Sequence, residues 1–136
     1  MSSHRIYEEK HDIDTVNTKN FYDQRAKNIG NMSSPYVAVL LGDQDPQHAV
    51  DWNTFEKTFI LPQLKVNKSS SVLDIGCGIG RWADSIIPEA GYYLGTDFSG
   101  EMIKIAQQRC SFENADYDFI NVSFQEACRR SSEKLQ

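Results

Sequence analysis

Three glycines and an aspartate are the residues of this chain whose types and spacing indicate ligand binding. Gly76, Gly78 and Gly80 alternate with small or apolar residues directly after the short run Val72–Ile75. Such a turn lets a ligand approach the backbone, because no side chain stands in the way, and it permits positive φ angles. The helix expected after the turn adds free N–H groups and a partial positive charge. Taken alone, the turn is equally consistent with a tight connection between a strand and a helix.

The aspartate, Asp97, follows the turn at the distance typical of nucleoside-binding folds. The segment Gly91–Thr96 is typical of a second strand, which would deliver Asp97 at its C-terminal end. A carboxylate about 20 residues after the glycine turn accepts hydrogen bonds from two neighbouring ribose hydroxyls in such folds. Ser99 is placed to cap a helix over Gly100–Cys110, whose apolar residues recur at helical spacing. Together these features predict a nucleoside-binding half-fold.

The exact glycine spacing distinguishes between classes of nucleoside cofactor. Dinucleotide-binding turns are normally Gly-x-Gly-x-x-Gly, whereas this turn is Gly-x-Gly-x-Gly with Asp74 in the strand before it. A carboxylate there would repel a pyrophosphate but not a cationic amino group. The segments Val72–Gly80 and Leu94–Ile103 resemble the first motif and the second-strand motif of class I S-adenosylmethionine-dependent methyltransferases. The resemblance extends from about Phe21 to about Glu126.

The resemblance implies a binding site for S-adenosylmethionine. Asp74 and the glycine turn would hold the methionine moiety, and Asp97 would bind the ribose hydroxyls. Three cysteines without metal-ligand spacing give no reason to expect a metal. The residues implied to bind the cofactor are Tyr22, Arg25, Asp74, Gly76, Cys77, Gly78, Gly80, Asp97, Phe98, Ser99, Met102 and Phe124.

Adenine recognition departs from the family pattern. Phe98 and Met102 would pack beside the adenine ring. The family commonly has an acid soon after the third strand, expected here over Tyr117–Val122, to bind the adenine amino group. Ser123 stands at that position, so the resemblance implies a backbone contact at Phe124 instead.

The N-terminal part contains a short segment that could cover the cofactor. Residues 1–19 are polar and are expected to form a flexible leader. The segment Asn20–Ala26 is predicted to form a short helix, and it resembles the N-terminal element that lies over the cofactor in many small-molecule methyltransferases. Tyr22 and Arg25 would then close the site, as an aromatic and a basic residue do there. The alternative is an amphipathic turn with Phe21 packed on the domain.

Two further segments are predicted to be structural. A helix capped by Asp45 begins at Pro46, because proline suits the first helical position. In this helix Trp52 and Phe55 are expected to form core contacts against the sheet, and His48 to be a surface residue without a partner. Residues 129–136 lack apolar periodicity and are expected to be a polar, solvated tail.

Composition limits the class of protein. At 136 residues the chain corresponds to one domain at most, and its net charge of −5 argues against strong binding to nucleic acid. It contains no run of 18 apolar residues and no signal peptide, so a cytoplasmic protein without a membrane partner is expected.

The predicted fold class is α/β: a Rossmann-like three-layer fold with N-terminal helices and about three parallel strands in the order 3-2-1. The family sheet has seven strands, so the chain is expected to be an incomplete half-domain over residues 20–128. The predicted function is an S-adenosylmethionine-dependent methyltransferase acting on a small molecule, with this fragment inactive alone. The alternatives are a non-catalytic nucleoside-binding or scaffold domain and, less favoured, a nicotinamide-dependent oxidoreductase. The exposed edge of the first strand is expected to promote self-association.

Overall fold

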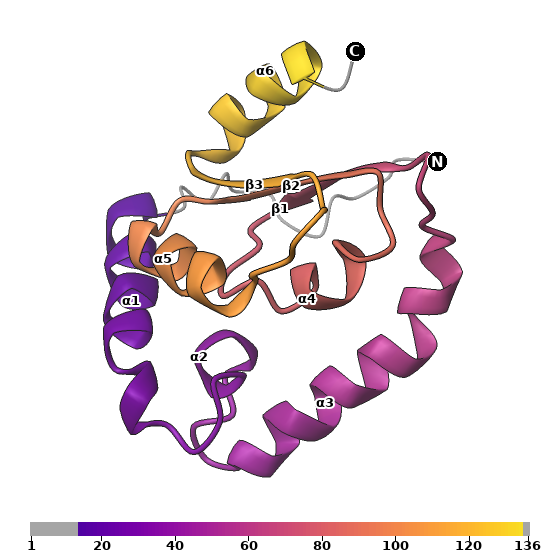
Figure 1. Ribbon diagram of the computed structural model, residues 1–136. Helices are drawn as coiled ribbons and strands as arrows, with labels where there is room; N and C mark the ends of the chain where they lie inside the picture. The colour runs from indigo at the N-terminus through magenta and orange to yellow at the C-terminus, as the bar shows by residue number, and fades with distance from the viewer. Residues whose placement is uncertain (1–13, 135–136) are drawn as a thin grey trace, which may run out of the picture.

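The computed structural model describes residues 14–134 as a three-stranded sheet with helices on both faces (Figure 1). The strands are β1 (Ser71–Ile75), β2 (Tyr92–Asp97) and β3 (Tyr117–Asn121). All pairings are parallel and β2 lies in the middle, which confirms the predicted fold class and the strand order 3-2-1. Because β1 and β3 each pair with β2 alone among the described strands, each has an open edge.

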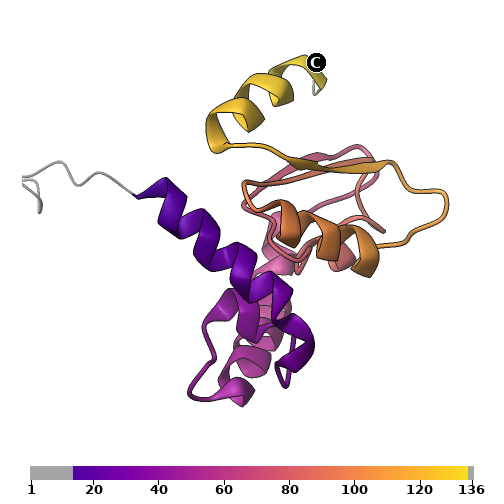
Figure 2. The ribbon, with the colours of Figure 1, turned by 90° about the vertical axis from the view of Figure 1, so that its left-hand side faces the viewer.

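Helices before and after the strands form the remaining layers. Helices α4 (Ala83–Ile86) and α5 (Gly100–Arg109) lie on one face of the sheet, and α6 (Phe124–Lys134) lies on the other, as Figure 2 shows from the side. Before the sheet come the remaining helical elements: α1 (Thr15–Lys27), the 3-10 turn η1 (Ile29–Asn31), α2 (Val37–Leu40), α3 (Pro46–Phe59) and the 3-10 turn η2 (Leu61–Leu64). Within residues 14–134 no helix has both the length and the apolar character needed to span a bilayer.

The main core lies between the sheet and helices α4 and α5. Alternate residues of a strand point to opposite faces, and the fully buried Tyr93 of β2 belongs to this core. The cluster comprises Ala83, Ile86, Ile87, Ala90, Tyr93 and Cys110. Gly95 of β2 must be small, since an added Cβ would lie 2.7 Å from the Phe119 ring. The register of β1 and β2, in which Ile75 lies beside Thr96, aligns the C-terminal ends of these strands, where the glycine turn and Asp97 lie.

The first helix begins earlier than the sequence predicted. Helix α1 begins at Thr15 instead of Asn20, because Asp14 accepts a hydrogen bond from the backbone N–H of Asn17 at 2.9 Å and caps the helix. Residues 14–19 are therefore not a loose leader. The rest of the predicted leader, residues 1–13, lies outside the described part.

Residues 129–134 of the predicted polar tail continue helix α6, and residues 135–136 lie outside the described part. Glu126 forms ion pairs with Arg129 at 2.8 Å and with Arg130 at 2.5 Å, at the helical spacings i,i+3 and i,i+4. These two arginines hold the pKa of Glu126 at about 2. Such local pairs favour a helix without requiring an apolar stripe. A search for apolar periodicity therefore did not identify residues 129–134 as helical.

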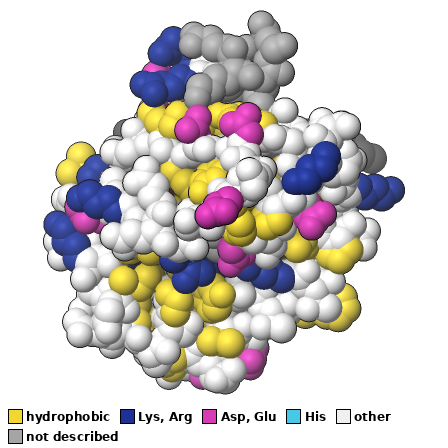
Figure 3. All heavy atoms as spheres, in the orientation of Figure 1, with side chains coloured by type: hydrophobic (Ala, Val, Ile, Leu, Met, Phe, Trp, Pro, Cys, Tyr) yellow, Lys and Arg dark blue, Asp and Glu magenta, His cyan; other side chains and the backbone are white. Residues whose placement is uncertain are grey.

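The prediction that Trp52 and Phe55 form core contacts is wrong. Trp52 is 45% exposed and Phe55 is 49% exposed. The residues that α3 buries are instead the smaller Ala49 and Asn53. His48 is exposed as predicted, but it has a partner, since its ring stacks on Trp52 with 6.1 Å between the centroids. Figure 3 shows hydrophobic side chains exposed between interspersed acidic and basic ones on one face of the molecule.

Candidate functional site

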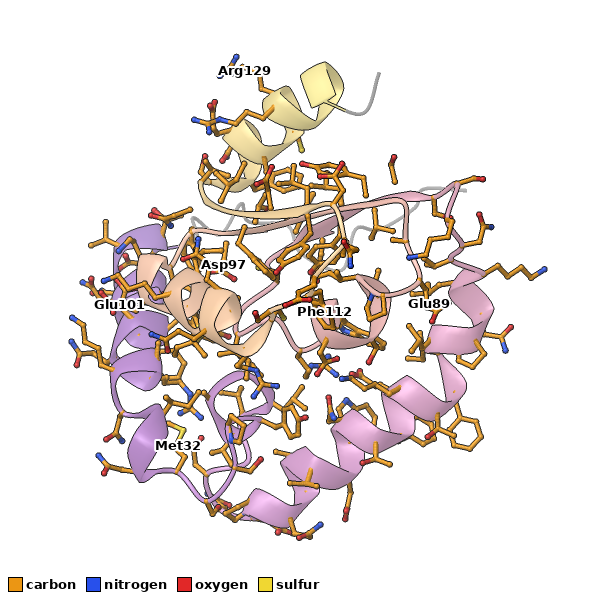
Figure 4. All side chains as sticks on the ribbon, in the orientation of Figure 1. Met32, Glu89, Asp97, Glu101, Phe112 and Arg129 are labelled. Atoms are coloured by element: carbon orange, nitrogen blue, oxygen red, sulfur yellow. The ribbon has the colours of Figure 1, made fainter. Side chains whose placement is uncertain are left out.

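The carboxylate of Asp97 is held at the C-terminal end of β2 by two backbone donors. The N–H of Gly78 donates to Asp97 Oδ2 at 2.9 Å, and the N–H of Ser99 donates to Asp97 Oδ1 at 2.9 Å. Each carboxylate oxygen offers two lone pairs, so each can still accept a bond from a ligand hydroxyl. The two donors belong to the glycine turn and to the start of α5, and the side chain is thus fixed between both elements (Figure 4).

The backbone of Asp97 is fixed from the neighbouring strand. The side-chain amide of Asn121 donates to the carbonyl oxygen of Asp97 at 2.9 Å, and the N–H of Val122 donates to the same oxygen at 3.0 Å. Burial raises the pKa of the Asp97 carboxyl, the two backbone N–H bonds oppose this rise, and the charge of Asp23 adds to it. Asp97 is therefore a buried acceptor, 8% exposed, with a defined orientation.

The three glycines of the turn all have positive φ angles, of 75°, 54° and 75°, but different surroundings. An added Cβ at Gly76 would meet no atom within 4 Å, whereas one at Gly78 would lie 3.1 Å from the Val39 side chain. At Gly80 it would lie 3.3 Å from the Cβ of Ala106 on α5. Gly76 therefore leaves open space beside the turn, and Gly80 allows close helix packing.

A cavity of about 250 Å³ lies between the turn, Asp97 and the N-terminal helices. Across it, the rings of Tyr22 on α1 and Phe98 are 6.4 Å apart in an edge-on arrangement. The residues that line the cavity are Tyr22, Val39, Gly76, Gly78, Asp97, Phe98 and Met102. The structure therefore brings together six of the residues that the sequence singled out, and adds Val39.

A second hollow of about 390 Å³ shares Phe98 with this cavity. It lies between the start of α1 and the segment after β3, and its lining consists of Thr15, Val16, Lys19, Asn20, Phe98, Asn121, Val122 and Ser123. Ser123 has a local role here, because its hydroxyl accepts a bond from the N–H of Glu126 at 3.3 Å in the first turn of α6. The two hollows together extend from the glycine turn past Phe98 to the end of β3.

Asp74 lies beside the site and does not line the cavity. Its Oδ2 accepts a hydrogen bond from the Tyr93 hydroxyl at 2.7 Å. Burial raises the pKa of the Asp74 carboxyl, although the Tyr93 hydroxyl and the charge of Arg81 act in the opposite direction. A half-buried carboxylate thus lies in the strand directly before the glycine turn.

The structure places Arg25 away from the cavity. Its guanidinium donates to the backbone carbonyls of Val37 and Ala38 and to Asp43, and thereby ties α1 to α2. It lines a larger hollow of about 720 Å³ along α1, which includes neither the glycine turn nor Asp97. We therefore place the candidate site at the smaller cavity beside Asp97.

The remaining candidates support the site or lie beyond it. The side chains of Cys77 and Ser99 are buried under the turn and at the start of α5, and burial raises the pKa of the Cys77 thiol. Gly80 packs against α5, as described above. Phe124 is 61% exposed at the start of α6 and lines neither cavity. The residues that sequence reasoning missed, Val39 and the first turns of α1, come from segments with no recognisable motif.

Comparison with known proteins found a matching family model and similar solved structures. Residues 72–134 match the family model described as a methyltransferase domain. A search of curated protein sequences found no match. Among solved structures, phosphoethanolamine N-methyltransferase 1 of Haemonchus contortus, bound to phosphoethanolamine and S-adenosylhomocysteine, is 23% identical with a TM-score of 0.56. A methyltransferase of Anabaena variabilis, described as S-adenosylmethionine-dependent, is 20% identical with a TM-score of 0.52.

The share of these structures that the chain spans is limited. The first match covers 79% of this chain and 22% of the Haemonchus protein. The second covers 92% of this chain and 47% of the Anabaena protein. The chain therefore spans about a fifth of the Haemonchus protein and about half of the Anabaena protein. At these identities the likeness shows a shared fold.

Proposed function

We propose that this chain, whose residues 72–134 match the methyltransferase-domain family model, is the cofactor-binding part of an S-adenosylmethionine-dependent methyltransferase. The observation that carries the proposal is the buried Asp97 carboxylate, oriented by the N–H groups of Gly78 and Ser99 at the wall of a cavity. A carboxylate held in this way is suited to two adjacent ribose hydroxyls. We extend the half-domain from Thr15 to Lys134, because α1 and α6 form part of the fold.

The surroundings of Asp97 suit the other parts of S-adenosylmethionine. The open space beside Gly76 lets the methionine moiety approach the backbone, and the nearby Asp74 carboxylate favours its cationic amino group. Phe98, which lines both hollows, would pack beside the adenine. When bound, the cofactor supplies an electrophilic methyl group on a sulfonium. The residues of this chain bind and orient it, and Tyr22 shields it from solvent on the side of α1.

We propose a small molecule as the methyl acceptor. The support is the fold shared with phosphoethanolamine N-methyltransferase 1, whose structure contains the small molecule phosphoethanolamine. The net charge of −5 gives no support to a nucleic-acid substrate. A reducing, cytoplasmic setting fits the two buried cysteines, Cys77 and Cys110.

Isothermal titration calorimetry tests the proposal directly. We expect one molecule of S-adenosylhomocysteine to bind per chain, and NAD to give no heat under the same conditions. Binding of NAD with no binding of S-adenosylhomocysteine would favour a nicotinamide-dependent oxidoreductase and contradict the proposal.

A non-catalytic nucleoside-binding domain is the second candidate function. It is favoured by the lining of the Asp97 cavity, in which Tyr22 and Asp97 are the residues with titratable side chains. The Asp97 carboxylate already serves as an acceptor for two backbone groups, and no residue of the lining is a histidine. Transfer of a labelled methyl group to an added small amine or alcohol would exclude a pure binding domain. Absence of transfer is expected of both candidates, because this fragment is expected to be inactive alone.

A further inference from the structure

A carboxylate on α1 reaches the start of α5 directly behind the candidate ribose site. The hydroxyl of Ser99 donates to Asp23 Oδ1 at 2.5 Å, across 76 positions of the chain. Lys19, one turn earlier on α1, contacts the other oxygen of Asp23 at 2.6 Å. The side chain of Asp23 is only 14% exposed. Figure 4 shows the first turn of α5, marked by Glu101, close to α1.

Ser99 connects this carboxylate to Asp97. Its N–H donates to Asp97 Oδ1 at 2.9 Å, while its hydroxyl oxygen accepts from the N–H of Met102 at 3.2 Å as the cap of α5. The hydroxyl proton has one direction left, and it points to Asp23. Since Ser99 is fully buried, its backbone and side chain cannot turn without breaking one of these bonds.

The charge on Asp23 is maintained by its surroundings. Although burial acts to raise its pKa, the bonds from Lys19 and Ser99 and the charge of Lys19 hold the pKa below its ordinary value. An ionised carboxylate also suits the N-terminus of α5, where backbone N–H groups point outward. Asp23 therefore acts as a second cap of α5, supplied by a different helix.

The position of Asp23 on α1 links this bond to the cavity. Tyr22, the adjacent residue, lines the cavity opposite Phe98. When Asp23 holds Ser99, α1 is fixed against the end of β2, and Tyr22 is fixed over the space beside Asp97. Loss of the bond between Ser99 and Asp23 would make Ser99 and Tyr22 more mobile. Asp97 would then lose a fixed hydrogen-bond donor, and the cavity would lose a fixed wall at Tyr22.

We propose that Asp23 is a positioning residue for the cofactor site, which acts through Ser99 to fix Asp97 and, through α1, Tyr22. This inference rests on the proposed function, since it concerns the affinity of the same site. Asp23 touches neither hollow and has no direct contact with a bound ligand in this arrangement. Its effect on binding is indirect and is carried by the contact between α1 and α5.

Calorimetric titration of the full 136-residue chain with S-adenosylhomocysteine tests the role of Asp23. We expect Asp23→Ala to weaken binding about tenfold, within the range measured for residues that act through their neighbours. Asp23→Asn keeps an oxygen that can accept from Ser99, so its affinity should stay within about threefold of the wild type. The matched control is Asp14→Ala, which removes the cap of the same helix without touching Ser99.

Combining Asp23→Ala with Ser99→Ala tests whether the effect passes through Ser99. If it does, the double variant binds about as weakly as Ser99→Ala alone. Circular dichroism and thermal unfolding accompany each titration, so that a loss of fold is distinguished from a loss of affinity. Fully additive losses in the double variant would overturn the route through Ser99.

The outcomes distinguish this inference from the proposed function. Wild-type affinity in Asp23→Ala, or equal weakening in Asp23→Ala and Asp14→Ala, would overturn the positioning role and leave the proposed function standing. Binding of S-adenosylhomocysteine to Asp23→Asn that is as weak as binding to Asp23→Ala would also overturn the positioning role and leave the proposed function standing. Absence of S-adenosylhomocysteine binding in the folded wild type would overturn the proposed function, and this inference with it.

Discussion

Replacement of Asp97 by alanine is the sharpest test of the candidate site. The carboxylate would form two charge-assisted hydrogen bonds to the ribose hydroxyls, each worth about 1.5–3 kcal/mol. Since removal of both also frees the hydroxyls to bond with water, we expect a loss of about 2–4 kcal/mol in binding free energy. This corresponds to a dissociation constant about 30- to 1,000-fold higher.

The same replacement also affects the ligand-free protein. In the structure, Asp97 accepts from the N–H groups of Gly78 and Ser99 at 2.9 Å each. Alanine leaves both donors unpaired at a buried position, and each such loss costs about 1–3 kcal/mol. Part of this cost is offset, because the folded state no longer buries a charge. We therefore expect a lower melting temperature with an intact circular dichroism spectrum.

Thermal unfolding with and without S-adenosylhomocysteine measures both effects in one experiment. A ligand at about 100 times its dissociation constant stabilises the folded state by about 2.7 kcal/mol. The wild type should show this shift, and Asp97→Ala should show little or none at the same ligand concentration. Asp116→Ala is the control, because this exposed aspartate precedes β3 at the opposite end of the sheet. An equal ligand-induced shift in Asp97→Ala and wild type would refute the assignment of Asp97 to the ribose.

Three further predictions concern the glycine turn, the half-buried Asp74 and the open edge of β1. Gly78→Val should abolish S-adenosylhomocysteine binding, because Gly78 has a φ of 54° and a Cβ there would lie 3.1 Å from Val39; normal calorimetric binding would mean that the turn is only a connector. Asp74→Asn should increase stability at neutral pH. Burial raises the pKa of Asp74 in the folded state above its ordinary value of 3.8. The protonated side chain therefore contributes its full stability below pH 3.8, and this contribution is lost as the pH rises through the folded-state pKa. The melting temperature of Asp74→Asn should therefore increasingly exceed that of the wild type from about pH 3 to pH 7. A difference that does not change with pH would contradict the raised pKa of Asp74. The open edge of β1 should cause the chain to self-associate, and Ile75→Lys, at a residue 42% exposed on that strand, should reduce the association; a monomer at all concentrations in light scattering would contradict the prediction.

The strand, turn and acid of the site could be predicted from the sequence because they depend on short-range constraints. The glycine turn requires positive φ angles at Gly76, Gly78 and Gly80, and the structure has all three. One helix and one strand separate Asp97 from the turn in the sequence. Because β1 and β2 are adjacent and parallel, their C-terminal ends lie side by side, and Asp97 therefore lies next to the turn. The cap Ser99 was recognisable for the same reason, since an N-cap acts on the first turn of its own helix.

The helix ends of α1 and α6 were less predictable, since local polar contacts decide them. Asp14 caps α1, which therefore begins at Thr15. In α6, Glu126 forms ion pairs with Arg129 and Arg130 at helical spacing. Neither contact produces apolar periodicity. A search for capping residues and for charge pairs at i,i+4 would have found both.

Only the tertiary structure decided which distant side chains join the site. Arg25 has the residue type expected of a cofactor ligand, yet its guanidinium binds backbone carbonyls of α2, whose position no local pattern reveals. Val39 lines the cavity from that same helix, and Asp23 reaches Ser99 across 76 positions. Trp52 lies on an apolar helical face that no described element covers, because periodicity identifies the apolar face of a helix but not its partner. Local spacing thus determined the glycine turn and the position of Asp97, while long-range packing determined what surrounds them.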